Sequence, residues 1–289
     1  MNKILTIIVT YNGMKWLDQC LSSVKKSTIP SDLFIVDNGS TDGSIEYIKK
    51  NYPEAIFIES KENLGFGKAN NIGLRQAAKN NYEYVYLLNQ DAWIEPDTFE
   101  KLIKVSENNP DYGILSPLQV NKEKTRLDKN FSHWIPSSMS SDLCCDQELK
   151  DVYETKFTMA AHWFIPVDKL KVVGGFSPAF RHYGEDNNLI DRMRFRDYKI
   201  GIVPDTMGVH DRENRTLSKE KKQYLSYVLT IAMLNNPTTR FRFIKLLKRI
   251  ISETFHPSDF NLRFALRSFG DYFRSKKFRK QYMETGAFL

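Results

Sequence analysis

An acid placed directly after an apolar run is the first feature of this sequence that suggests chemistry. Asn89, Gln90 and Asp91 follow the apolar residues 85–88. Hard cations such as Mg²⁺ and Mn²⁺ prefer oxygen ligands and take one or two carboxylates together with substrate phosphates. His210 follows the last apolar run and is a candidate for a further ligand. A single histidine more often has a structural role, so both interpretations stay open for His210.

Three more positions have side chains that could bind or react. Asp37 ends another apolar run, where its carboxylate could hold a ribose hydroxyl or a base N–H, or could simply cap a turn before a helix. Glu185 and Asp186 precede a predicted helix, so they either cap it or provide a general base. Trp163 could stack on a sugar ring or belong to the core.

A glycine-containing stretch, residues 63–73, has the sequence NLGFGKANNIG. It is not a dinucleotide fingerprint, because Asn70 stands where that motif needs Gly or Ala and because the stretch lies in the third strand-turn-helix unit. The glycines still permit a close approach of the backbone to a ligand. A helix that begins here would also favour a phosphate at its N-terminus.

The elements that must position these side chains alternate along the first 110 residues. Apolar, β-branched runs predict strands and the segments between them predict helices: strands 4–12, 33–40, 55–60 and 84–91, and helices 14–26, 43–51, 66–79 and 97–108. This alternation predicts an α/β protein with a parallel sheet flanked by helices. Such sheets bind ligands beyond the carboxyl ends of their strands, so we expect residues 10–12, Asp37 and Asp91 at one edge.

The second half of the chain is less regular. Residues 121–156 are polar and predict a long loop or lid, and residues 157–166 predict a strand. A helix is expected from Glu185, and a final strand at 200–211. From 217 onward we expect helices only, with breaks at Pro237 and Pro257. We therefore predict one domain at 1–215 and a C-terminal helical extension at 216–289.

Composition excludes several classes of protein. The chain has 289 residues, of which 41% are hydrophobic, and this content is typical of a globular protein. No apolar run reaches the ~18 residues of a membrane span. The three cysteines form no CxxC pair, which argues against a disulfide framework or a zinc site and favours a cytoplasmic location. No zinc, helix-turn-helix or RNP-type motif supports a role in nucleic-acid binding.

The C-terminal extension carries a strong positive charge. The net charge is +7, and residues 212–289 hold 17 Lys and Arg against 6 Asp and Glu. In residues 240–251, Phe241, Ile244, Leu247 and Ile251 fall on one helical face among basic residues. Such a face suits peripheral contact with the anionic inner surface of the plasma membrane. The alternative, which we prefer from the sequence, is that this apolar face packs on the first domain. A third interpretation is that the C-terminal helices form a homodimer contact.

Taken together, a series of short motifs resembles family 2 glycosyltransferases with the GT-A fold. The motifs occur in the order of the family and extend over about residues 1–211: VTYN (9–12), VDNGSTDGS (36–44), NLGFGKANNIG (63–73), NQDAW (89–93), VGGF (173–176), GED (184–186) and VHD (209–211). NQDAW resembles the rhamnosyltransferase-like branch. The resemblance implies a Rossmann-like, mostly parallel sheet flanked by helices, and a catalytic domain at 1–215 that binds a nucleotide sugar.

The resemblance also implies a reaction and its residues. The reaction is inverting transfer of a sugar from a UDP- or dTDP-sugar to a hydroxyl of a glycan or lipid-linked acceptor, in the synthesis of bacterial cell-surface polysaccharide. Asp186, beside Glu185, is the implied base, and Asp91 and His210 are the implied ligands of Mn²⁺ or Mg²⁺. The implied donor-binding residues are Thr10, Tyr11, Asn12, Asp37, Asn63, Gly65, Phe66, Asn70, Asn89, Gln90 and Trp163.

One departure from the family pattern leaves alternatives open. Asn89 replaces the first acid of the D-x-D signature, so only Asp91 brings charge to a metal, and either weaker metal binding or a smaller metal dependence is the expectation. A non-catalytic sugar-nucleotide-binding relative is one alternative, although the retention of Asp91, Asp186 and His210 argues against it. A sugar-phosphate nucleotidyltransferase is another, but the stretch VTYNGMKW after the first strand lacks the arginine that its loop needs.

Overall fold

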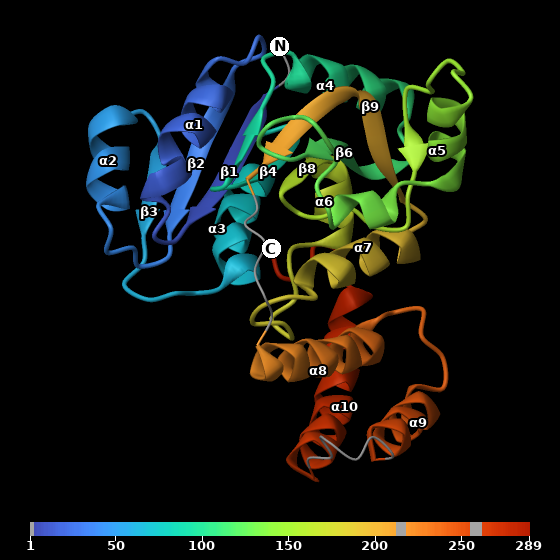
Figure 1. The fold of residues 1–289 in the computed structure, drawn as a ribbon. Helices are drawn as coiled ribbons and strands as arrows, with labels where there is room; N and C mark the ends of the chain where they lie inside the picture. The colour runs from blue at the N-terminus through green and yellow to red at the C-terminus, as the bar shows by residue number, and fades with distance from the viewer. Residues whose placement is uncertain (1–2, 212–217, 255–261) are drawn as a thin grey trace.

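The computed structural model describes residues 3–211, 218–254 and 262–289. Its described part contains a nine-stranded sheet with helices on both faces, and a group of helices stands below the sheet (Figure 1). The strands follow the order β3-β2-β1-β4-β8-β6-β9-β5, and the short strand β7 pairs with β9. The predicted α/β class is confirmed. The first half of the chain shows how the sequence produces it.

The first half folds as the pattern of apolar runs predicts. Its strands are β1 (Ile4–Thr10), β2 (Ser31–Asp37), β3 (Ile56–Glu59) and β4 (Tyr84–Asn89), and its helices are α1 (Met14–Lys25), α2 (Ser44–Asn51), α3 (Phe66–Lys79) and α4 (Thr98–Asn108). The four strands pair in parallel, with Thr10 opposite Asp37 and Val9 opposite Asn89. This register brings the polar strand ends to one edge of the sheet.

The second half makes the sheet mixed rather than wholly parallel. It adds β5 (Ala92–Ile94), β6 (Tyr112–Val120), β8 (His162–Pro166) and β9 (Lys199–His210), with the helices α6 (Val167–Val173) and α7 (Glu185–Phe195). Strand β8 lies between β4 and β6 and runs antiparallel to both. Strand β6 ends at the carboxyl edge of the sheet, and a long segment follows it on that side. The chain then enters β8 from the carboxyl edge, so β8 runs in the opposite direction.

That excursion, residues 121–156, is more ordered than the polar composition predicts. It contains a 3₁₀ turn (Phe131–Trp134), the helix α5 (Ser137–Cys144) and the strand β7 (Tyr153–Glu154). Phe131, Met139 and Tyr153 are buried in the main core. The expectation of an irregular lid is therefore wrong for the middle of this segment, because three apolar side chains anchor it to the sheet.

Two apolar cores lie on the two faces of the sheet. On one face α1, α2 and α4 contribute Leu17, Ile48 and Leu102. On the other face α3, α6 and α7 contribute Leu74, Leu170 and Leu189. Burying a side chain of this size stabilises the fold by ~1.5–3 kcal/mol. The sheet is therefore a rigid platform with its carboxyl edge open to ligands.

The C-terminal part contains only helices in its described residues, as predicted. They are α8 (Lys219–Asn235), α9 (Arg242–Thr254) and α10 (Leu262–Tyr282), and Pro237 follows the end of α8. The second predicted break, at Pro257, and the predicted domain boundary at 215/216 lie outside the described residues. No helix among the described residues combines the length and the apolar character that crossing a bilayer requires.

The chain end returns from α10 to the sheet-containing part of the protein and packs against the segment before α7. The Gly175 N–H donates to the carbonyl of Ala287 (2.8 Å), and Ser177 and Tyr282 pair through their hydroxyls (2.9 Å). Gly174 has φ +92°, and a Cβ there would lie 2.0 Å from the Ala287 oxygen. The buried guanidinium of Arg192 donates to the Val173 carbonyl (2.9 Å). The chain end thus supports the segment that leads to Glu185.

Candidate active site

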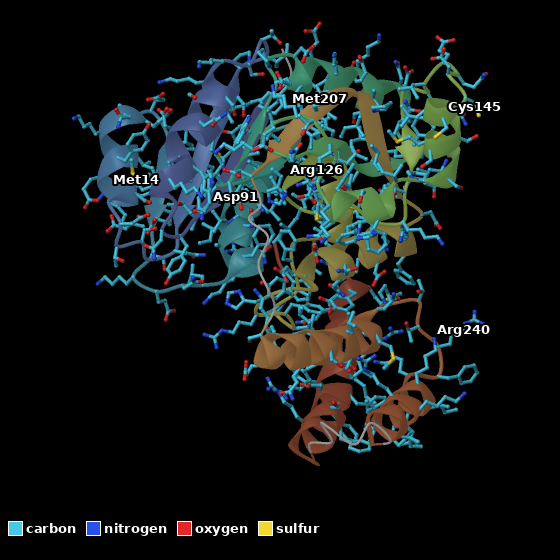
Figure 2. All side chains as sticks on the ribbon, viewed as in Figure 1. Met14, Asp91, Arg126, Cys145, Met207 and Arg240 are labelled. Atoms are coloured by element: carbon cyan, nitrogen blue, oxygen red, sulfur yellow. The ribbon has the colours of Figure 1, made fainter. Side chains whose placement is uncertain are left out.

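A pocket of about 820 Å³ opens at the carboxyl edge of the sheet. Figure 2 shows Asp91 at the border between the first-half strands (blue) and the second-half strands (green and orange). The pocket brings together three carboxylates and an imidazole from three places: Asp91 between β4 and β5, His210 at the end of β9, and Glu185 with Asp186 at the start of α7. Phe66 and Asn89 also line it. Six of the residues that the motifs single out therefore meet in one pocket, whereas the other predicted donor-binding residues do not line it.

His210 lies between two carboxylates. Its Nε2 is 3.5 Å from Asp91 Oδ1 and its Nδ1 is 3.7 Å from Asp128 Oδ2. The imidazole is buried, and its Nδ1 has no hydrogen-bond partner. Asp128 is fixed in turn, because its Oδ1 accepts from the backbone N–H of Asn130 (2.8 Å) and Phe131 (3.0 Å). A carboxylate behind a histidine commonly orients the ring toward a metal.

The donor set fits a divalent cation in part. Among the described residues, no group of three or more His, Cys, Asp or Glu side chains is arranged to hold a metal ion. Asp91 and His210 nevertheless line the same pocket with ligand atoms 3.5 Å apart. Two protein ligands leave several coordination positions for phosphate oxygens and water, which is how Mg²⁺ sites in phosphate-handling enzymes are commonly built. The site therefore fits a metal that is completed by its substrate.

Three residues that the sequence did not single out complete this side of the pocket. Asp211 Oδ2 accepts from the Trp16 indole (3.0 Å) and contacts the Lys122 ammonium (3.2 Å). The Asp211 N–H donates to the Asp91 carbonyl (2.8 Å), which fixes the turn that carries Asp91. Asp211, in the VHD motif, could have been found from its neighbour His210. Trp16 and Lys122 carry no such signal, because only the fold brings them together.

Glu185 and Asp186 differ in environment although they are adjacent. Glu185 is buried, and its Oε2 has no hydrogen-bond partner. Burial, reinforced by the Asp186 charge, raises the pKa of Glu185 to about 7. Asp186 is half-buried and accepts from the Asn187 N–H (2.8 Å) at the first turn of α7. The more accessible of the two carboxylates is therefore Asp186.

The raised pKa of Glu185 predicts a pH-dependent effect on stability. Below pH ~4.5 the Glu185 side chain is protonated in both the folded and the unfolded states. Between pH ~4.5 and ~7 only the folded state keeps the proton. The stability that the protonated side chain contributes is therefore lost as the pH rises through ~7. We expect Glu185→Gln to be more stable relative to wild type at pH 8 than at pH 5, by at most about 3 kcal/mol. Urea unfolding at the two pH values measures this difference.

Glu46, an exposed glutamate of α2, provides the control for that comparison. Glu46→Gln should change the free energy of unfolding equally at both pH values. If Glu185→Gln behaved in the same way as Glu46→Gln, the Glu185 carboxyl would not hold its proton in the folded protein.

Asp37 offers a polar atom that the fold leaves unpaired. Its Oδ1 accepts from the N–H groups of Gly39 (2.9 Å) and Ser40 (2.8 Å), whereas Oδ2 is buried without a hydrogen-bond partner. Asn12 lies beside this loop, where its Oδ1 accepts from the Thr41 N–H (2.9 Å). The first and second strand ends are therefore joined. Asp37 is fully buried and does not line the pocket, and one of its carboxylate oxygens has no partner within the protein.

Three of the expected donor-binding residues, Gln90, Thr10 and Trp163, make hydrogen bonds within the protein. The Gln90 side-chain amide makes two hydrogen bonds to the Tyr11 backbone. Its Oε1 accepts from the Tyr11 N–H (2.8 Å), and its Nε2 donates to the Tyr11 carbonyl (3.2 Å). Thr10, which is buried, also donates to Gln90 Oε1 (2.9 Å). Trp163 is fully buried in the core and donates to the Thr158 carbonyl (3.1 Å). The expectation that Trp163 stacks on a sugar is wrong, because β8 points its ring into the core.

The glycine-containing loop supports the pocket mainly through its shape. Gly65 has φ +81°, and a Cβ there would lie 2.6 Å from the Arg181 carbonyl, so the backbone of the two loops is in close contact. Asn63 Oδ1 accepts from the Gly65 N–H (2.9 Å), and Asn70 Nδ2 donates to the Phe66 carbonyl (3.0 Å). Of these residues only Phe66 lines the pocket.

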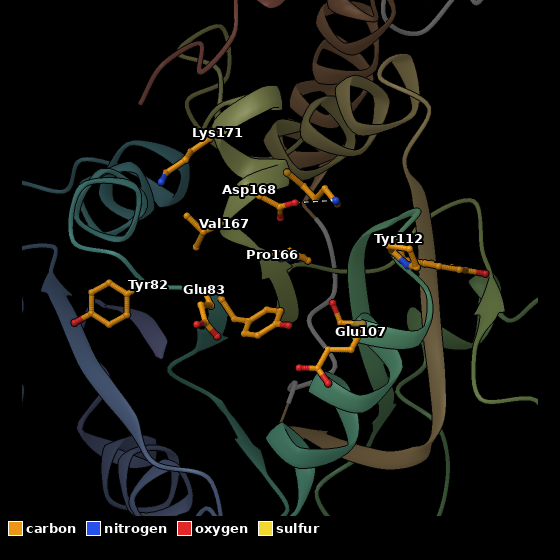
Figure 3. A pocket seen from close by; sticks show the side chains of 12 residues that line it. Tyr82, Glu83, Glu107, Tyr112, Pro166, Val167, Asp168 and Lys171 are labelled. Carbon is orange, nitrogen blue, oxygen red and sulfur yellow. Dashed lines mark hydrogen bonds and ion pairs between the residues drawn. The ribbon is translucent and has the colours of Figure 1, made fainter. Parts of the chain in front are cut away.

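A second hollow lies at the opposite edge of the sheet (Figure 3). It has a volume of about 440 Å³ and is lined by residues at the start of β4, the start of β6 and the end of β8, among them Glu83, Tyr112 and Pro166. None of the predicted site residues contributes to it. Because ligands of such sheets bind at the carboxyl edge, the pocket at Asp91 is the candidate active site.

The strand order, the flanking helices and the acids at the carboxyl edge define a GT-A type of fold. Solved structures agree. S. aureus TarS (residues 1–349) in complex with UDP aligns with a TM-score of 0.60 at 18% identity and covers 97% of this chain and 83% of that one. GalNAc-T7 with UDP, GalNAc and Mn²⁺ aligns with a TM-score of 0.67 at 14% identity and covers 100% and 55%. At these identities the likeness shows the fold alone.

The family follows from the sequence. Residues 6–169, more than half of the chain, match the family described as Glycosyl transferase family 2. The chain belongs to this family, and the resemblance drawn from the motifs is confirmed.

Three relatives show how far the similarity extends. GlyA of Streptococcus pneumoniae is 35% identical over 106 residues, which are 36% of this chain and 15% of GlyA. EpsH of Bacillus subtilis is 29% identical over 270 residues, 79% of this chain and 76% of EpsH. The N-acetylglucosaminyl-diphospho-decaprenol L-rhamnosyltransferase of Mycobacterium tuberculosis is 28% identical over 128 residues, 41% of this chain and 42% of that protein. The chain thus spans only a small part of GlyA.

Proposed function

We propose that this protein is an inverting glycosyltransferase that moves a sugar from a nucleotide-diphosphate donor to a hydroxyl of a glycan or lipid-linked acceptor. The observation that carries the proposal is the meeting of Asp91, His210 and the pair Glu185–Asp186 in one pocket. Cell-surface polysaccharide is the proposed product. The lipid-linked acceptor in the printed name of the mycobacterial relative supports this choice.

The unpaired oxygen of Asp37 supports a nucleotide donor. A buried carboxylate oxygen without a partner costs free energy until a donor group reaches it. An N–H of uracil or thymine, or a ribose hydroxyl, would satisfy it, so UDP and dTDP are the proposed nucleotides. The complex of TarS with UDP supports the same class of ligand.

Asp91 and His210 would hold a divalent cation, Mn²⁺ or Mg²⁺, on the donor side of the pocket. Such an ion supplies charge that stabilises the departing diphosphate. Asp128 would keep the His210 ring in place from behind, at 3.7 Å from Nδ1. Asn89 lines the pocket next to Asp91 and brings no charge, so Asp91 is the one carboxylate that the strand end β4–β5 offers to the metal.

Asp186 would act as the general base. A hydroxyl is a poor nucleophile until a base takes its proton in the transition state. Asp186 lines the pocket and is more accessible than Glu185, so it can reach a bound acceptor. Direct attack of that hydroxyl on the anomeric carbon inverts the centre in one displacement and needs no nucleophile from the protein.

Calorimetric titration of the full chain with UDP, dTDP and GDP, each with Mn²⁺ and with EDTA, tests the proposal. We expect UDP or dTDP to bind, with weaker binding in EDTA. Asp37→Asn should weaken that binding roughly 10–100-fold, because it removes a hydrogen bond to a charged group. Glu46→Gln, a surface variant of equal charge change, should bind like wild type. Absence of binding for all three nucleotides would contradict a nucleotide-sugar enzyme.

A further inference from the structure

The helix α9 presents an outward face that combines apolar and basic side chains. Ile244, Lys245, Lys248 and Ile251 are exposed and recur at positions that lie on one side of a helix. Ile244 is 51% and Ile251 54% exposed, and Phe241, directly before the helix, is 75% exposed. Arg240, labelled in Figure 2, projects from the outer side of the helical extension. The sequence-based preference for packing on the first domain is therefore wrong, because these apolar side chains face outward.

The opposite face of α9 is occupied. Leu246 is fully buried, Arg249 donates to the Ser226 carbonyl of α8 (2.9 Å), and Arg242 donates to Ser275 of α10 (2.9 Å). The helix is thus fixed on α8 and α10 by its inner side chains. Its outer face is held in place without taking part in the fold.

We propose that this outer face of α9, Phe241 to Ile251, docks the protein on an anionic lipid surface. Residues 240–251 contain five Lys and Arg and no acid. Apolar side chains that enter the headgroup region, with lysines that reach the phosphates, are the features of helices that lie in a membrane interface. A second copy of the chain is the less suitable occupant, because pairing two such faces would bring the exposed Lys245 and Lys248 of one copy toward the same lysines of the other.

Helix α8 connects the proposed lipid-facing side with the active-site pocket. Lys221 and Leu225 of α8 line the active-site pocket, and Ser226 of the same helix accepts the bond from Arg249 of α9. One helix therefore separates the lipid-facing side from the pocket. A lipid-linked acceptor would reach Asp186 from the surface on which the protein sits. The docking itself goes beyond the proposed reaction and does not depend on it.

Sedimentation of the full chain with phosphatidylcholine vesicles, with and without phosphatidylglycerol, tests the proposal. We expect binding only to vesicles that contain phosphatidylglycerol, and weaker binding as salt screens the surface charge. Lys245→Gln/Lys248→Gln should weaken binding about 30-fold, since each lysine near an anionic surface contributes about 1 kcal/mol. Lys50→Gln/Lys79→Gln, two exposed lysines of the catalytic half, should bind like wild type.

The apolar contribution is tested by Ile244→Gln/Ile251→Gln, which should weaken binding at least about 10-fold. Absence of binding to both vesicle types, or equal loss in the Lys50→Gln/Lys79→Gln control, would overturn the proposal. It would also be overturned if wild type formed dimers that the isoleucine variant abolished while vesicle binding stayed unchanged. Nucleotide titration is independent of vesicles, so failure of the docking and failure of the proposed reaction are distinguished.

Discussion

Asp186→Asn should lower the turnover number by ~10²–10⁴-fold while the affinity for the nucleotide donor stays nearly unchanged. The amide keeps the size and the hydrogen bond to the Asn187 N–H but cannot take a proton. A donor held through Asp91, which belongs to a different element of the pocket, would keep its contacts in this variant. The measurement is single-turnover kinetics with saturating donor, together with calorimetry of the same variant.

Glu185→Gln is the matched control, because Glu185 is the adjacent carboxylate of the same pocket. A pKa of about 7 is also what a base at neutral pH needs, so Glu185 is a real rival for the role. We expect turnover to fall less than about 10-fold in Glu185→Gln, since its carboxyl is buried and the glutamine imitates its protonated form. A large loss in Glu185→Gln with normal turnover in Asp186→Asn would exchange the two roles.

The parts of the fold and site that the sequence predicts are those set by local pattern. The strand β4 ends at Asn89 because the apolar run ends there, and the rule that parallel sheets bind at their carboxyl edge places Asp91 in the pocket. The start of α7 at Glu185 is equally local, since Gly184 precedes it with φ +81°. No knowledge of distant contacts is needed for any of these residues.

The parts that the sequence does not predict depend on which segments meet in three dimensions. Asp128 belongs to a polar stretch without periodicity, and only the anchoring of Phe131 in the core brings it behind His210. Gln90 stands in a ligand motif but its amide is used by Tyr11, across 79 positions of sequence. Every residue of β8 is buried, so both faces of the strand are covered, and the polar residues before it in the sequence do not indicate that Trp163 lies in the core.

Asp91→Asn should weaken donor binding roughly 10–100-fold in the presence of Mn²⁺. Substituting a residue that only hydrogen-bonds to a metal ligand already causes a loss of this size. The reason is that Asn89 already lacks charge, so the variant leaves no carboxylate at the end of β4. In EDTA the variant and wild type should bind the nucleotide equally. Asp205→Asn, which removes the same charge from an exposed position remote from the pocket, should match wild type in both conditions.

The two conditions separate a metal ligand from a structural aspartate. The bond that holds the turn joins the Asp211 N–H to the backbone carbonyl of Asp91, so it survives the substitution (2.8 Å in wild type). A structural role of the Asp91 side chain, such as one through His210 at 3.5 Å, would lower donor affinity with and without metal. Equal losses in Mn²⁺ and EDTA would therefore remove Asp91 from the metal site. A loss confined to Mn²⁺ would assign it there, because the carboxylate would then affect the donor through the metal alone.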